Sequence, residues 1–122
     1  MGLPVSQKMM SKSSGTITCN GSGVGAGTVA GVNGEVIGIF VDLGNATSVV
    51  ATVTSDTAAV MLNGVTVSAD TFYPVRRNAV INDGTTAISN SFVPYVNFGG
   101  SIVVGCTTGG SGKTFSVVIY YR

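Results

Sequence analysis

The chain has 122 residues, which is enough for one domain with a buried core and too few for two domains of ordinary size. Only 9% of its residues are charged and 44% are hydrophobic, whereas roughly a quarter are charged in an ordinary domain. The net charge of +1 predicts no nucleic-acid partner, and no apolar run approaches the ~20 residues of a membrane-spanning helix. Histidine is absent, which removes the usual acid–base group at neutral pH and the commonest metal ligand. We therefore expect no membrane partner, no cofactor, no metal and no enzymatic activity.

The N-terminal residues 1–14 are polar and lack the apolar segment of a secretory signal. We expect them to form a flexible arm, followed by a single domain over residues 15–122. Without a secretory signal, Cys19 and Cys106 are expected to be reduced and buried. Because two cysteines are an even number, a disulfide between them remains an alternative.

A glycine-rich stretch follows at 20–34, and it predicts either a long loop or a weakly specified edge strand. Within it, residues 21–26 match the G-x-G-x-x-A pattern of dinucleotide-binding turns. The residues that follow, GTVAGVNG, form helices poorly, since each glycine costs about 1 kcal/mol relative to alanine. We reject a dinucleotide site because its pattern requires a helix there.

Most of the remaining chain alternates apolar and polar residues with a period of two, which is typical of strands. The clearest examples are 35–43, 48–54 and 113–121, and shorter candidates lie at 15–19, 58–62, 65–67, 76–81, 92–98 and 101–106. In each of the three clearest strands, alternate residues are expected to share one face: Ile37, Ile39, Val41 and Leu43 in the first, Val49, Ala51 and Val53 in the second, and Phe115, Val117, Ile119 and Tyr121 in the third. Glycine and Asn-Gly or Asp-Gly turns separate the candidates. The pattern predicts an all-β, antiparallel, jelly-roll-like β-sandwich of eight or nine short strands.

The outward faces of these strands carry Val, Thr, Tyr and Ala, with few charges. Isolated monomers usually place Lys and Glu on such faces, so we expect other chains to cover part of this surface. The five carboxylates, Glu35, Asp42, Asp56, Asp70 and Asp83, all lie near turns or strand ends. We interpret them as solvated turn residues rather than as a catalytic pair.

Two other segments carry possible chemistry. Residues 109–114, GGSGKT, resemble a phosphate-binding loop, but a strand follows where such a loop needs a helix, so we predict a hairpin turn. The segment TFYPVRR (71–77) combines aromatic residues with positive charge at a proline corner. Tyr73, Arg76 and Arg77 are the candidate interface residues, because Tyr and Arg are enriched where proteins bind one another. Adjacent Arg76 and Arg77 are expected to point to opposite faces of a strand.

The order of these segments from residue 34 to 121 resembles a known family. It runs from GEVIGIFV (34–41) through a Thr/Val strand (47–54) and the Tyr-Pro-x-Arg corner (73–76) to the terminal VVIYY. This order is similar to that of the small β-sandwich cement, or decoration, proteins of tailed bacteriophages. The resemblance implies a non-enzymatic virion protein, made in the host cytoplasm, that sits on the capsid surface. Its expected partners are the major capsid protein and itself, as a homotrimer.

Two other functions are alternatives to a capsid role. A tail or fibre component would also be an all-β virion protein, although no internal repeat supports it. A carbohydrate-binding β-sandwich module would need an exposed aromatic platform, for which the candidates are Tyr73, Tyr95, Phe98, Tyr120 and Tyr121.

Overall fold

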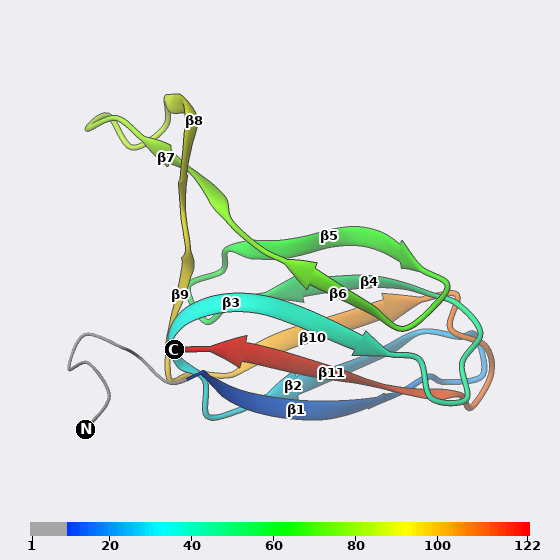
Figure 1. Ribbon diagram of the computed structural model, residues 1–122. Coiled ribbons are helices and arrows are strands. Elements are labelled where there is room, and N and C mark those ends of the chain that lie inside the picture. The colour runs from blue at the N-terminus through cyan, green and yellow to red at the C-terminus, as the bar shows by residue number, and fades with distance from the viewer. Residues whose placement is uncertain (1–9) are drawn as a thin grey trace, which may run out of the picture.

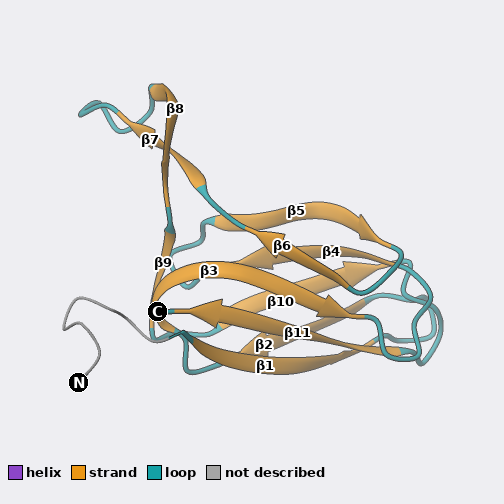
Figure 2. Ribbon diagram, viewed as in Figure 1, coloured by secondary structure: helices purple, strands orange, loops and turns teal. Residues whose placement is uncertain are grey.

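The computed structural model describes residues 10–122, and this part of the chain forms eleven β-strands and no helix (Figures 1 and 2). Most of the strands build two antiparallel sheets. The first sheet contains, in spatial order, β1 (Ser11–Thr18), β11 (Thr114–Tyr121), β3 (Asn33–Asp42) and β6 (Thr71–Pro74), with β9 (Tyr95–Phe98) also paired to β3. The second contains β2 (Gly25–Val29), β10 (Ile102–Thr107), β4 (Val49–Thr54) and β5 (Val60–Val67). The predicted all-β antiparallel sandwich is confirmed.

The two sheets enclose one apolar core. Val, Ile and Phe side chains with no more than 1% of their surface exposed come from both sheets, among them Ile17, Val29, Ile39, Val53, Ile102 and Phe115. Alternation along β4 and β11 places Val49, Ala51, Val53, Phe115, Val117 and Ile119 in this core, so each strand buries one of the two faces that its alternation indicates. Branched and aromatic side chains favour such half-buried pleated surfaces, which accounts for the strands that they form.

The strand order is that of a jelly roll. β6 pairs with Gly38–Val41 of β3, and β9 pairs with the preceding residues 33–36 of the same strand. β6 and β9 therefore act as one interrupted strand along one edge of β3. With these two counted as one and the two strands within residues 75–94 left out, eight strands remain, and the first pairs with the eighth, the second with the seventh, the third with the sixth and the fourth with the fifth. Residues 75–94 are inserted at the interruption, which is why eleven strands replace the expected eight or nine.

The glycine-rich stretch supplies the edge strand β2. β1 and β2 belong to different sheets and approach closely at one side of the sandwich. A Cβ atom placed on Gly15 would lie 2.5 Å from the Thr28 carbonyl oxygen, and one on Gly25 would lie 2.6 Å from that of Thr18. Glycine is needed here because only a backbone without side chains permits this approach.

Three local expectations are corrected. Residues 11–14, expected in the flexible arm, pair with β11 as the first half of β1, while residues 1–9 lie outside the described residues. Ile37 does not share the core face of Ile39. Tyr120 pairs with Gly38 but Tyr121 pairs with Val36, so Ile37 is an extra residue in a β-bulge and Val36 is buried instead. Finally, Asn63 and Gly64 do not form a turn, since they lie in irregular pairing inside the continuous strand β5.

Candidate interaction surface

The inserted residues 75–94 form what we call the projecting hairpin. Its strands are β7 (Arg77–Val80) and β8 (Ala87–Val93), which pair with each other and with no strand of either sandwich sheet. The hairpin leaves the edge of β3 and extends away from the sandwich (Figure 1). The sequence-predicted strand at 92–98 is divided between β8 and β9 by Pro94, which has no N–H to donate to a ladder.

Exposed apolar side chains concentrate on this hairpin and on the adjoining β9. Phe98 is 71% exposed and Phe92 is 54% exposed. Six of the eleven large hydrophobic residues exposed in the described chain lie here: Ile81, Ile88, Phe92, Val93, Val96 and Phe98. Solvent-exposed apolar residues scattered singly are normal, whereas a group of them on one element is typical of an interaction surface.

The structure places the three predicted interface residues around the base of the hairpin. Tyr73, in β6, is half-buried and packs against the sandwich core. Arg76 lies with its guanidinium carbon 5.4 Å from the centre of the Phe92 ring, a cation–π arrangement. Arg77 begins β7 and is exposed. The two arginines are therefore available at the surface, whereas most of the Tyr73 ring is engaged within the chain.

A shallow hollow lies on each side of the hairpin base. The first, of about 270 Å³, is lined by Arg76 together with Phe92, Val75 and Ile37. The second, of about 250 Å³, is lined by Arg77 together with Tyr95, Val96 and Phe98. Arg76 precedes β7, so the alternation expected of two adjacent strand residues does not apply to this pair. Both hollows are open and mainly apolar.

Buried hydrogen bonds fix the base of the hairpin to the sandwich. Asn97 in β9 is fully buried, and its side-chain amide nitrogen donates to the carbonyl oxygens of Val32 and Gly100, both at 2.9 Å. Its side-chain oxygen accepts from the Asp56 N–H at 2.8 Å. In return, the Asp56 carboxylate accepts from the backbone N–H groups of Phe98 and Gly100. The strand that returns from the hairpin is thus locked to the loop between β4 and β5.

The tip of the hairpin is ordered by one carboxylate. Oδ1 of Asp83 accepts from the N–H groups of Thr85 and Thr86, both at 2.9 Å, and Oδ2 accepts from the Thr86 hydroxyl at 2.6 Å. The hydrogen bonds from Thr86, together with that from Thr85, lower the pKa of Asp83 from its ordinary value of 3.8 to about 2. Asp83 is therefore an anion at neutral pH, at the opposite end of the hairpin from Arg77.

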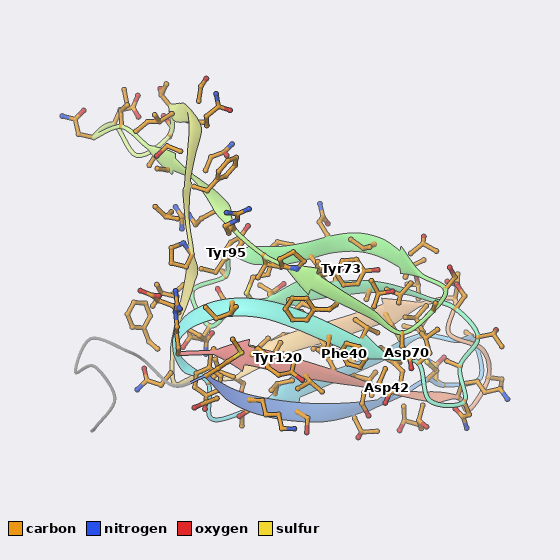
Figure 3. The ribbon with its side chains drawn as sticks, viewed as in Figure 1. Phe40, Asp42, Asp70, Tyr73, Tyr95 and Tyr120 are labelled. Atoms are coloured by element: carbon orange, nitrogen blue, oxygen red, sulfur yellow. The ribbon has the colours of Figure 1, made fainter. Side chains whose placement is uncertain are left out.

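A second apolar patch, of which the platform candidates expected from sequence included only Tyr120, lies on the outer face of the first sheet. Phe72 and Tyr120 meet edge to face, with ring centres 5.8 Å apart and planes at 71°. Phe40 and Tyr120 lie on the same side of this sheet and border one shallow hollow (Figure 3). The Phe72 ring lies directly over Gly38, where a Cβ atom would collide with it. In the sequence, Gly38 could have indicated this patch, since a glycine inside a strand marks close approach by another group.

The remaining polar candidates serve local structure. Asp42 and Asp70 accept the N–H groups of Gly44 and Leu43 at the end of the sandwich away from the hairpin (Figure 3). Glu35 forms an ion pair with Arg122 at 3.7 Å. The hairpin turn predicted at 109–114 is wrong, because these residues lead from β10 in the second sheet to β11 in the first, and the two strands do not pair with each other. Residues 21–24 connect β1 to β2 without any helix. Within residues 10–122, no three potential metal ligands cluster and no helix could cross a membrane.

The two cysteines lie against each other in the core. Their sulfur atoms are 3.5 Å apart, and both are free thiols that join the end of β1 to β10 in the opposite sheet. Burial raises the pKa of Cys106 to about 11, with a further contribution from Cys19. The neutral thiol is therefore favoured at neutral pH, in agreement with the expectation of reduced, buried cysteines.

Comparison of the chain with models of protein families, with curated proteins and with solved structures gave no match. The fold and the projecting hairpin are consequently the basis for any functional assignment, and the resemblance to phage decoration proteins remains a prediction.

Proposed function

We propose that this protein is a non-enzymatic structural component of a virion that binds the outside of a tailed-phage capsid and stabilises contacts between major capsid subunits. In this proposal it self-associates, as a homotrimer, and is made in the host cytoplasm before it joins the capsid surface. The observation that carries the proposal is the projecting hairpin, which presents exposed apolar side chains from a rigid sandwich.

Physical considerations support a binding role for this hairpin. A two-stranded hairpin is at best marginally stable alone in water, and this one has no pairing to either sheet. The buried contacts of Asn97 nevertheless fix its base, so the exposed side chains are held in place rather than collapsed onto the sandwich. Several copies bound together would multiply weak individual contacts, as a protein that braces a shell requires.

The use of the polar residues supports a non-enzymatic role. Four of the five carboxylates accept backbone N–H groups at turns or between loops, and the fifth pairs with Arg122. A carboxylate used in this way positions the chain.

Co-sedimentation with capsid shells tests the proposal. Expanded shells assembled from the major capsid protein of the same phage would be mixed with the wild-type protein and with a variant in which residues 76–93 are replaced by an Asn-Gly turn. We expect the wild type to sediment with the shells and the shortened variant to stay in solution. The Phe72→Ala variant, altered at the other apolar patch, is the matched control and should still sediment. Failure of the wild type to bind shells would refute the capsid role, and binding to isolated tails instead would favour a tail or fibre component.

The outer patch of the first sheet favours a second candidate function, a carbohydrate-binding module. Phe40, Phe72 and Tyr120 provide exposed aromatic surface beside Lys12, and sugar rings stack on such surfaces. Of the platform residues expected from sequence, Tyr73, Tyr95 and Tyr121 instead pack against the core. A glycan array that gives hits for the wild type and none for Phe72→Ala would establish this function, and an array without hits would remove it.

A further inference from the structure

We propose that the projecting hairpin of one copy packs against the projecting hairpin of a second copy, with the tip of one at the base of the other. The inference rests on the assembly role proposed above, since it assigns the surface through which the chain associates with itself. It concerns the hairpin alone and leaves the outer sheet faces for other contacts.

The hairpin is incomplete by itself. β7 and β8 pair through Arg77 with Val93, Asn78 with Phe92 and Val80 with Ala87, so four residues of β8 oppose one of β7 between the last two pairs. Two strands with so irregular a ladder enclose no core of their own. A hydrophobic face on such a ribbon becomes stable when further strands or another layer cover it. Ile81, Ile88 and Phe92 are the side chains that such a layer would bury.

The charges on the hairpin indicate that the covering molecule is a second copy of this chain. Within residues 77–94 the only charged side chains are Arg77 at the base and Asp83 at the tip, and Arg76 adjoins the base. Neither arginine and no oxygen of Asp83 takes part in an ion pair within the described residues. Two identical hairpins side by side in the same direction would place like charges together. With opposite directions, or in a head-to-tail ring, each Asp83 meets the arginines of the next copy.

The length of the hairpin fits the same arrangement. Asp83 follows Arg77 by six positions, which corresponds to at most ~20 Å of extended chain. A second hairpin that aligns its tip with this base therefore overlaps the apolar side chains between Ile81 and Val93. In that arrangement Ile81 of one copy, close to its tip, lies near Phe92 and Val93 at the base of the other. Charge pairing and apolar burial thus require the same relative position.

The apolar part of the contact is tested by solution mass. Light scattering or sedimentation would measure the wild type, Phe92→Ala and Phe72→Ala over a range of concentrations. We expect an oligomer for the wild type, a self-association constant weakened about tenfold or more by Phe92→Ala, as for a central aromatic contact, and no change for Phe72→Ala. Circular dichroism and thermal unfolding of each variant confirm that the sandwich is intact.

The direction of the contact is tested by charge. Arg77→Glu places a carboxylate beside Asp83 of the second copy and is expected to weaken association several-fold. Addition of Asp83→Asn in the same chain removes that repulsion, while the Asn side-chain oxygen still accepts from Thr85 and Thr86, so part of the loss should be recovered. Lys12→Glu makes the same charge change on the outer face of the first sheet and should have no effect.

The outcomes separate this inference from the capsid role. A monomeric wild type at 100 µM would overturn the hairpin contact, and so would an oligomer that Phe92→Ala leaves intact, whether or not the protein binds shells. Weakening by Arg77→Glu that Asp83→Asn does not relieve would overturn the tip-to-base direction. An oligomer sensitive to Phe92→Ala that fails to bind shells would support the hairpin contact and refute the capsid role.

Discussion

Phe115 in the sandwich and Phe92 in the projecting hairpin are both phenylalanines on β-strands, yet 1% of the first is exposed and 54% of the second. The sandwich buries its apolar side chains between two sheets, so its stability comes from its own sequence. The hairpin has only one layer, and its apolar side chains face outward. Strands of the same kind therefore stabilise a fold when a second layer covers them, and leave their apolar side chains exposed when no layer does.

The largest expected effect comes from replacing a phenylalanine by alanine, once in the sandwich and once in the hairpin. Phe115→Ala removes a fully buried ring and is expected to lower the free energy of unfolding by about 3–5 kcal/mol. Phe92→Ala, measured at a concentration where the protein is dissociated, should change it by less than about 0.5 kcal/mol, as for a surface position. Urea unfolding followed by tyrosine fluorescence measures both values. Equal losses would show that the hairpin is part of the folded core.

The next prediction concerns Asn97, whose buried hydrogen bonds fix the base of the hairpin to the sandwich. Asn97→Ala leaves the Asp56 N–H and the carbonyl oxygens of Val32 and Gly100 without their partner in the interior. We expect a loss of about 2–3 kcal/mol in the free energy of unfolding. Asn78→Ala, at an exposed position of β7, is the matched control and should be near neutral. Hydrogen exchange should show faster exchange at Phe98 and Gly100 in the Asn97 variant, and unchanged rates there would contradict the anchoring role.

The close approach of β1 and β2 predicts a smaller effect within the sandwich. Gly15→Ala forces a methyl group against the Thr28 carbonyl oxygen and is expected to cost about 1–3 kcal/mol of unfolding free energy. Gly105→Ala, in β10, meets no atom within 4 Å and should be neutral or stabilising by about 0.5 kcal/mol. Thermal unfolding compares the two, and equal melting temperatures would disprove the steric argument.

The smallest predicted effect concerns pH at the hairpin tip. The pKa of Asp83 is about 2 in the folded chain, below its ordinary value of 3.8. The turn is therefore stabilised at pH values above 3.8, and this contribution is lost as the pH falls from 3.8 to about 2. The amide resonance of Thr86 should titrate with a midpoint near pH 2 and become insensitive in Asp83→Asn, while resonances of the sandwich strands stay constant. A midpoint near 3.8 would show that the carboxylate does not hold the turn.

Sequence patterning predicted much of the sandwich because burial follows a period of two along a regular strand. β4 and β11 each bury one of the two faces that their alternation indicates. The prediction failed where pairing became irregular. At Ile37 a bulge in β3 moves the core position to Val36, and at Asn63 and Gly64 an expected turn lies inside β5. A bulge is set by the partner strand, so a strand's own sequence shows it poorly.

The candidate surface was predicted less fully than the sandwich. Arg76 and Arg77 were found from the aromatic and basic residues around Pro74, and they do lie at the hairpin base. Tyr73 was grouped with them although it packs against the core. Of the exposed hydrophobic residues from Ile81 to Phe98, the sequence analysis named Phe98 alone. The others were missed, because an apolar residue in a strand pattern is indistinguishable from a core residue until the opposing layer is known.

The sequence by itself determined the fold class, since short alternating segments of β-branched residues with glycine turns have few stable arrangements other than two packed antiparallel sheets. Only the tertiary structure decided that residues 75–94 leave the sandwich. Their strands look like the others locally, and whether such a strand is covered depends on residues far away in the chain. One edge of β3 pairs with β11 and the other with β6 and β9. β7 and β8 pair only with each other, and their apolar side chains face outward.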